Sequence, residues 1–229
     1  MATPPKRPSP PRRPPFSPRA TTVFRVSLVA GGLGLASAGY ATWQYYHSPY
    51  WNRIGFAPGQ PVLFSHRHHA GELRLDCRNC HSTVESSAFA GMPSTHTCLA
   101  CHSQIFTDTA MLQPVVASGA SDQPLAWTRV TALPDHVYFN HSIHLAKGVG
   151  CTTCHGDVGN LALMAKTQPL TMRWCVDCHR DPGPRLQPRE ELFSPHPPPA
   201  RRSPAEAAAL LATYGVHREH LTNCSTCHR

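Results

Sequence analysis

Five copies of the pentapeptide Cys-x-x-Cys-His account for all ten cysteines of this 229-residue chain. The first cysteines of the five copies are Cys77, Cys98, Cys151, Cys175 and Cys224, and the second cysteines are Cys80, Cys101, Cys154, Cys178 and Cys227. The closing histidines are His81, His102, His155, His179 and His228. This repetition constrains the fold more than any other feature, because every cysteine belongs to the same chemical unit.

Cys-x-x-Cys-His is the attachment pattern of c-type haem. The two thiols form thioether bonds to the haem vinyl groups, and the histidine binds the iron from one face. Zinc sites usually combine two separated ligand pairs around one ion. Disulfides between cysteines three positions apart are awkward in regular structure and close only small loops. The pattern therefore predicts five covalently bound haem c groups rather than zinc, iron–sulfur clusters or disulfides.

The N-terminal region combines a basic tail with an apolar stretch. Residues 1–19 are rich in Pro and Arg and are predicted to form a disordered cytoplasmic tail. Residues 20–46 are predicted to form a transmembrane anchor with aromatic residues at its far end. A cleaved signal peptide is the alternative interpretation, because Ala36-Ser37-Ala38 resembles a cleavage site.

Charge sets the expected topology. Six of the 21 basic residues lie in the first 25 positions, so the positive-inside rule places the N-terminus in the cytoplasm. We therefore expect a single-pass protein of the bacterial cytoplasmic membrane, with residues 47–229 as a periplasmic haem domain. From residue 26 onward the basic and acidic residues number 15 and 13, and the haem propionates add negative charge. Nucleic-acid binding is not expected, despite the net charge of +8 for the whole chain.

The motifs are spaced 21, 53, 24 and 49 residues apart, so they form two close pairs and a single copy. A His-x-x-His pair precedes the first, the third and, more loosely, the fifth motif, and the leading histidines are 75 and 76 residues apart. This indicates an internal repeat of about 75 residues. The paired histidines are His66 with His69, His141 with His144, and His217 with His220.

Each low-spin haem needs a second axial ligand, which is usually His or Met. Helical positions three apart share a face but diverge enough to reach different haems. We therefore predict His66, His69, His141 and His144 as distal ligands of four irons. For the fifth iron the candidates are Met172, His217 and His220, followed by His96 and Met92 just before the second motif. His47, His68, His136 and His196 are expected to lie in solvent or in local hydrogen bonds.

The fold class follows from the ratio of polypeptide to cofactor. From Ile54 onward, 176 residues would serve five haems, which is too little chain to enclose them in an ordinary core. We expect a mostly irregular chain with short α-helices, a multihaem cytochrome c wrapped around five haems, plus the N-terminal transmembrane helix. One helix is predicted from Pro204 to Tyr214, with Ser203 and Glu206 as a capping box and Gly215 at its end.

Several strings resemble a particular family. They are Phe56-Ala57-Pro58-Gly59-Gln60-Pro61-Val62, Phe139-Asn140-His141-Ser142-Ile143-His144, Lys147-Gly148-Val149-Gly150-Cys151, Trp174-Cys175-Val176-Asp177-Cys178-His179-Arg180 and Pro188-Arg189-Glu190-Glu191-Leu192-Phe193. From about Ser48 to the C-terminus, the chain resembles the pentahaem cytochrome c subunit (ActA) family of bacterial alternative complex III. More distantly, it resembles the cytochrome c3 and c7 group.

The resemblance implies an electron-transfer subunit of a quinol-oxidising membrane complex, with no catalytic site on this chain. Its partners would be an iron–sulfur subunit, polytopic membrane subunits and a monohaem cytochrome c. It also implies Met172 as an axial ligand, whereas His217 and His220 lie outside the family pattern. The alternatives are a stand-alone quinol-oxidising cytochrome that feeds a periplasmic reductase, or a pentahaem reductase. The latter typically carries one Cys-x-x-Cys-Lys motif, which this chain lacks.

Overall fold

The structure of the protein is a computed structural model that describes residues 17–228. The predicted tail over residues 1–16 lies outside the described residues. The chain divides into two compact units, Met1–Trp51 and Asn52–Arg229. The division falls between the apolar helix and the part of the chain that carries the five motifs.

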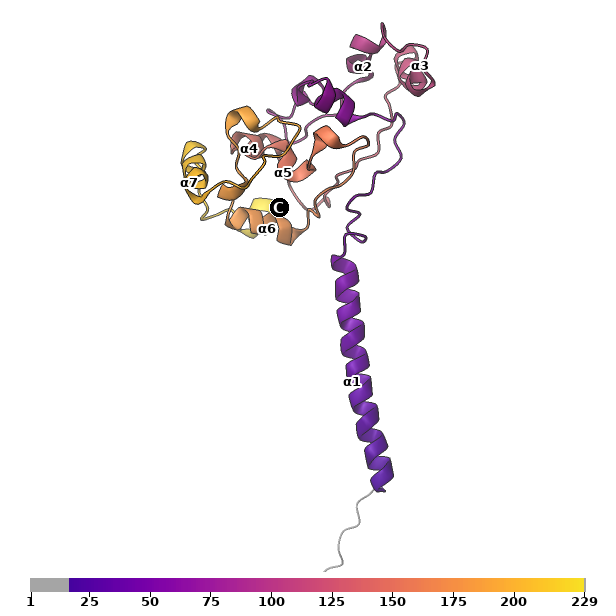
Figure 1. Cartoon of the computed structure of the whole chain (residues 1–229), viewed down its shortest axis with the longest axis vertical. Coiled ribbons are helices and arrows are strands. Elements are labelled where there is room, and N and C mark those ends of the chain that lie inside the picture. Colours follow the sequence, from indigo (N-terminus) through magenta and orange to yellow (C-terminus); the bar gives the residue numbers. More distant parts are fainter. Residues whose placement is uncertain (1–16, 229) are drawn as a thin grey trace, which may run out of the picture. The chain divides into compact units, whose positions relative to one another are not determined.

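The first unit contains one long helix, α1 (Pro18–His47) (Figure 1). It begins two residues before the predicted boundary, because Ser17 caps it by accepting a hydrogen bond from the backbone N–H of Ala20 and Pro18 suits the first turn. Its most apolar window has a mean hydropathy of 1.3, and none of that window is buried. The helix is long and apolar enough to cross a membrane. A signal sequence would pass the same test, so the anchor stays a prediction.

The second unit is built from short helices joined by irregular chain. The α-helices are α2 (Thr95–His102), α3 (Gln113–Ser121), α4 (His141–Ala146), α5 (Cys151–His155), α6 (Met172–Arg180), α7 (Pro204–Thr213) and α8 (Cys224–Cys227). The tighter or wider helical turns are η1 (Arg67–Glu72), η2 (Cys77–Asn79), η3 (Ala110–Leu112), η4 (Val158–Asn160), η5 (Gly183–Arg185) and η6 (Arg189–Glu191). No strand occurs within residues 17–228, which confirms the prediction of an irregular chain with short helices.

Within this unit, α4, α5, α6 and α7 lie together, whereas α2 and α3 lie at the other end (Figure 1). Helix α7 shows how local chemistry determines an element. Ser203 accepts a hydrogen bond from the backbone N–H of Glu206, and the Glu206 carboxylate accepts from the backbone N–H of Ser203. Gly215 follows with φ +55°, which confirms the predicted start and end of this helix.

The polypeptide core of the second unit is small. Among the described residues, the largest side chain that is almost fully buried is Leu186, and a single cluster gathers Val84, Leu145 and Leu192. Interiors of ordinary domains are continuous and close-packed. Protein atoms alone do not provide such an interior here, as expected for a chain whose core is completed by a large cofactor.

A tyrosine connects the loop after α4 to the end of α7. The Tyr214 side chain is 8% exposed, and its hydroxyl donates a hydrogen bond of 2.7 Å to the carbonyl oxygen of Gln187. Its ring lies against Gly148, which has φ +84° and where an added Cβ would collide with the ring. Both the positive φ and the close approach favour glycine at this position.

We expect Gly148→Ala to destabilise the protein by about 1–3 kcal/mol, because it adds both backbone strain and a collision. The apparent thermal midpoint at a fixed scan rate measures the effect. Gly59→Ala is the matched control, because an added Cβ at Gly59 meets nothing within 4 Å. Equal midpoints for the two variants would contradict this account of the Tyr214 contact.

Candidate haem-binding site

The five motifs lie on helical turns. They occupy η2, the end of α2, all of α5, the second half of α6, and α8 with the residue after it. In the first motif the backbone N–H of His81 donates to the carbonyl of Cys77, at 2.9 Å. Such a turn places the residues i, i+3 and i+4 on one face. Two thiols and one imidazole can therefore reach the same cofactor. All ten cysteines are free thiols, so no disulfide competes for them.

Burial divides the sixteen histidines into two sets. The nine predicted ligands are all half-buried, namely His66, His69, His81, His102, His141, His144, His155, His179 and His228. The other seven are all exposed, namely His47, His68, His96, His136, His196, His217 and His220. A buried imidazole needs partners for its polar atoms, so the half-buried set is the set that requires a chemical explanation.

Most of these nine rings use Nδ1 in a hydrogen bond to a backbone carbonyl. The bonds join His69 to Ser65, His81 to Gly91, His102 to Ile105, His141 to Ala88, His144 to Asn140, His179 to Leu221 and His228 to His136. A metal-binding histidine characteristically donates its other ring N–H to such an acceptor, which sets its tautomer and orientation. In these seven rings Nε2 is the nitrogen left for a metal.

Three of the predicted distal histidines face the closing histidine of a motif. The ring centroids are 6.2 Å apart for His69 with His102, 6.4 Å for His141 with His155 and 6.2 Å for His144 with His179. A metal–imidazole bond is about 2 Å long, so two imidazoles on opposite sides of one metal ion have centroids about 6 Å apart. The observed spacing therefore matches two axial ligands of one iron.

The two histidines of each His-x-x-His pair face different motifs. His141 faces the third motif and His144 the fourth, while His69 faces the second. His66 lies near the first motif: burial lowers its pKa, and the charge of His81 lowers it further. One helical turn thus supplies imidazoles to both members of a close pair of motifs.

The two copies of this arrangement have nearly the same geometry. Phe64 stacks on His69 with centroids 4.4 Å apart, and Phe139 stacks on His144 with centroids 4.5 Å apart. The same phenylalanines make edge contacts with the leading histidine of each pair, at 4.9 Å and 4.7 Å. The internal repeat is therefore structural, with an aromatic ring that orients both imidazoles. Tyr214, in the looser third copy, is instead buried against Gln187.

Burial keeps the most enclosed rings neutral. It lowers the pKa of His155 to about 4, and the charges of His141, His81 and His66 act in the same direction. Burial also lowers the pKa of His66 to about 4, with the charges of His81 and His69 adding to the effect. Metal binding requires the neutral form of imidazole. The Nδ1 atom of His66 is buried without a hydrogen-bond partner.

The donor set fits a haem iron better than a bare metal ion. Within residues 17–228, no group of three or more His, Cys, Asp or Glu side chains converges on a common point. A zinc site would require such a group, so the zinc interpretation is not supported. Haem needs only two axial ligands from the protein, because the porphyrin supplies the other four. Facing imidazole pairs beside two thiols meet that requirement.

Thiols from different motifs lie close to one another. Burial raises the pKa of Cys98, Cys154 and Cys175, and at each of them the charge of a thiol in another motif raises it further. The thiols that interact electrostatically between motifs are Cys98 with Cys80, Cys77 with Cys151, Cys154 with Cys178 and Cys175, and Cys175 with Cys227. These interactions link the motifs in the order second, first, third, fourth and fifth.

Several of the remaining histidines make local interactions. His68 pairs with the Glu72 carboxylate at 2.8 Å, and His196 pairs with Asp157 at 2.7 Å. His47 bonds to the carbonyl of Trp43. These contacts agree with the local roles expected from the sequence.

His136 has a role that sequence reasoning missed. Its backbone carbonyl accepts from Nδ1 of His228, and the two rings lie 5.7 Å apart at 20°. Since the acceptor is a backbone atom, no residue type at this position could have indicated it.

Met172 is the residue predicted to complete the fifth motif, whose closing histidine is His228. Met172 begins α6, one turn before Cys175, and its side chain is 68% exposed. The thiol of Cys175 interacts electrostatically with Cys227 of the fifth motif, and Met172, three residues earlier, lies on the same face of α6 as Cys175. The alternatives His96, His217 and His220 are all exposed.

Comparison with known proteins agrees with this geometry. The family described as "Cytochrome c7 and related cytochrome c" matches residues 137–229. The "Menaquinone reductase, multiheme cytochrome c subunit" of Nitratidesulfovibrio vulgaris (strain Hildenborough) is 36% identical over 141 residues, which cover 52% of this chain and 67% of that protein. The chain belongs to the multihaem cytochromes c. This multihaem cytochrome c therefore carries covalently bound haem c and takes part in electron transport.

We expect His144→Ala to convert one haem of this multihaem cytochrome c from six-coordinate low-spin to high-spin iron, because His144 faces His179. Electron paramagnetic resonance and visible spectra of the purified full-length protein measure the change. His196→Ala is the control, because His196 is exposed and pairs with Asp157. An unaltered low-spin spectrum for His144→Ala would remove it from the ligand set.

Proposed function

We propose that this chain is the pentahaem electron-transfer subunit of a membrane-bound quinol:acceptor oxidoreductase of the alternative complex III kind, and that it has no catalytic site. Haem iron, when bound, supplies one-electron redox chemistry. The chain's own residues attach the haem, orient the axial imidazoles and exclude water. The observation that carries the proposal is the continuous row of five attachment motifs.

The residues that would hold each group follow from the facing pairs. Each motif supplies two thiols and one proximal imidazole, and His66, His69, His141 and His144 serve the first, second, third and fourth motifs as distal ligands. Met172 would complete the fifth. The Phe64 and Phe139 rings orient the distal imidazoles, and backbone carbonyls hold their tautomers.

The row has two ends, the second motif on α2 and the fifth on α8. Each of these two motifs has another motif on one side only, so partner proteins are expected to exchange electrons there. The most exposed cysteines are Cys101 and Cys224, which belong to these two motifs. A chain that only relays electrons needs such accessible ends, and it needs no pocket for an organic substrate.

Anchoring and partners complete the proposal. Helix α1 would span the bacterial cytoplasmic membrane once, with the N-terminus in the cytoplasm and the motif-bearing unit in the periplasm. Integral membrane subunits would carry the quinol site, an iron–sulfur subunit would share the complex, and a monohaem cytochrome c would accept electrons. The 36% identity to a multihaem cytochrome c subunit of a menaquinone reductase supports a quinone-linked role.

That relative also favours a second candidate, in which electrons run toward the quinone. That relative is a menaquinone reductase subunit, and this direction of electron flow is the reverse of the one proposed above. A relay without a catalytic site serves either direction, because the potentials of its partners determine the flow.

Purification of the full-length protein from native membranes tests the proposal. We expect iron–sulfur and polytopic subunits to co-purify, and a menaquinol analogue to reduce the haems of the complex. Isolation of this chain alone, as a cytochrome that a quinol reduces directly, would contradict it and support a stand-alone quinol dehydrogenase. Rapid oxidation of the reduced complex by a menaquinone analogue, with no reduction by the quinol, would favour the second candidate.

The fifth ligand is tested separately. Because a methionine ligand raises the haem potential, we expect Met172→His to lower one midpoint potential and leave the other four nearly unchanged. A redox titration followed by visible spectroscopy measures all five. Met111→His is the control, since Met111 is similarly exposed at 58% but lies on η3. Unchanged potentials in Met172→His would leave Met172 as a packing residue.

A further inference from the structure

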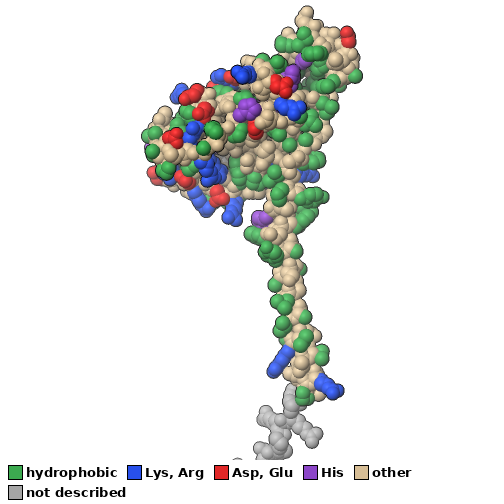
Figure 2. Space-filling view, viewed as in Figure 1, with side chains coloured by type: hydrophobic (Ala, Val, Ile, Leu, Met, Phe, Trp, Pro, Cys, Tyr) green, Lys and Arg blue, Asp and Glu red, His purple; other side chains and the backbone are tan. Residues whose placement is uncertain are grey.

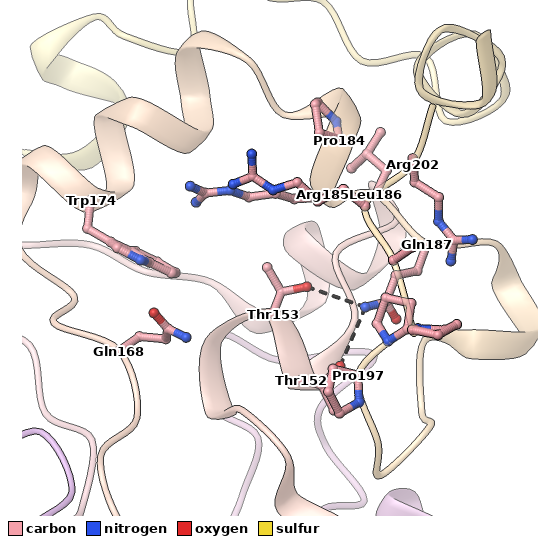
Figure 3. Close-up of a pocket in the computed structure, with 14 residues that line it drawn as sticks. Thr152, Thr153, Gln168, Trp174, Pro184, Arg185, Leu186, Gln187, Pro197 and Arg202 are labelled. Atoms are coloured by element: carbon pink, nitrogen blue, oxygen red, sulfur yellow. Dashed lines mark hydrogen bonds between the residues drawn. The ribbon is translucent and has the colours of Figure 1, made fainter. Parts of the chain in front are cut away.

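A pocket of about 400 Å³ lies behind the third motif (Figure 3). Its floor is formed by Thr152 and Thr153, the two residues between the cysteines of that motif. Trp174, Arg185 and residues 197–202 also line the pocket. This volume is within the range of ordinary small-ligand sites. The facing imidazole pairs do not line it, so it is distinct from the axial ligand positions.

The lining is cationic. Three arginines, Arg185, Arg201 and Arg202, contribute to it, and none of the lining residues is acidic. The space-filling view shows most of the basic side chains of this unit away from the end that carries α2 and α3, interspersed with acidic side chains (Figure 2). A pocket with this lining attracts anions.

Two guanidinium nitrogens of the pocket arginines have unmet hydrogen-bonding capacity. Nη1 of Arg185 and Nε of Arg202 are buried and have no hydrogen-bond partner. A buried donor without an acceptor is destabilising, and more so when it is charged. Arg202 binds the Glu191 carboxylate through Nη2, so only some of the N–H groups of its guanidinium have an acceptor. Two such atoms in one pocket point to a missing acceptor.

Arg185 is held in place by its surroundings. Its guanidinium lies over the Trp174 ring, 5.5 Å from the centroid. It also interacts with the thiols of Cys178 and Cys154. Burial raises the pKa of both thiols, and the positive charge of Arg185 lowers it. The pocket therefore lies near cysteines of the third and fourth motifs.

Buried neutral groups add oriented donors. Gln187 and Thr152 are 3% and 4% exposed. Nε2 of Gln187 donates to the hydroxyls of Thr152 and Thr153, at 3.5 Å each (Figure 3). A hydroxyl that accepts one hydrogen bond keeps its own proton to donate. Both threonine hydroxyls can thus donate to a ligand beside the arginines.

We propose that this pocket is a carboxylate-binding site, in which Arg185 and Arg202, with the exposed Arg201 beside them, bind a carboxylate that the threonine hydroxyls help to orient. Charge-assisted hydrogen bonds from guanidinium to carboxylate are stronger than hydrogen bonds between neutral groups. The carboxylate has two possible sources, a ligand from solution or a propionate of one of this chain's own haems. The site does not depend on the identity of the redox partners.

Citrate titrated calorimetrically into the full-length holoprotein tests the first source, with Arg185→Gln, Arg201→Gln and the control Arg218→Gln. Arg218 bridges to Asp181 and lies outside the pocket lining. Redox-difference infrared spectra of the same four proteins test the second source, because a carboxylate changes its bands when its guanidinium partner is removed. Arg201→Gln keeps the test open if Arg185→Gln fails to fold, since Arg201 is exposed.

For a solution ligand, we expect citrate to bind the wild type and Arg218→Gln alike, and about tenfold or more weakly to the two pocket variants. For a haem propionate, we expect no citrate binding but altered carboxylate bands in the pocket variants only. Both results support a carboxylate site and identify its source. Equal citrate affinities in all four proteins, or no citrate binding together with unaltered bands, would overturn the proposal.

Discussion

The spacing between facing imidazoles is the constraint on which the rest of this structure depends. Ring centroids 6.2–6.4 Å apart leave room for one metal ion between them and for nothing larger along that axis. The chain holds this spacing with single helical turns, carbonyl acceptors for Nδ1 and one stacked phenylalanine in each repeat. With so few buried aliphatic side chains among the described residues, packing of the polypeptide alone could not maintain it.

The His-x-x-His turn explains why the motifs come in close pairs. A turn can present two imidazoles on neighbouring positions of one face, and each then meets the closing histidine of a different motif. Two motifs that share a turn must lie near each other in space, and the spacings of 21 and 24 residues are short enough for that. The thiol contacts extend the pairing into a row, because Cys77 of the first pair meets Cys151 of the second.

Electrostatic interactions act on both the axial histidines and the thiols of the third and fourth motifs. At the axial positions, burial and mutual repulsion lower the pKa of His66 and His155 to about 4, so both rings stay neutral and able to bind metal at physiological pH. Around the third and fourth motifs, arginines concentrate positive charge near the thiols, where Arg185 acts on both Cys154 and Cys178. The carboxylate pocket is a consequence of that concentration.

The sequence by itself determined the chemistry of haem attachment, because the two cysteines and the histidine of each motif lie within five consecutive residues and one helical turn brings them to the same face. It also indicated which turn carries distal ligands, since the Phe-x-His-x-x-His pattern recurs in phase with the motifs, and it predicted the capping of α7 from local residue types. Only the tertiary structure decided which imidazole faces which, the order of the motifs in space, the His136 carbonyl beside His228 and the arginine pocket. These depend on contacts between residues far apart in the chain, and on backbone atoms that carry no sequence signal.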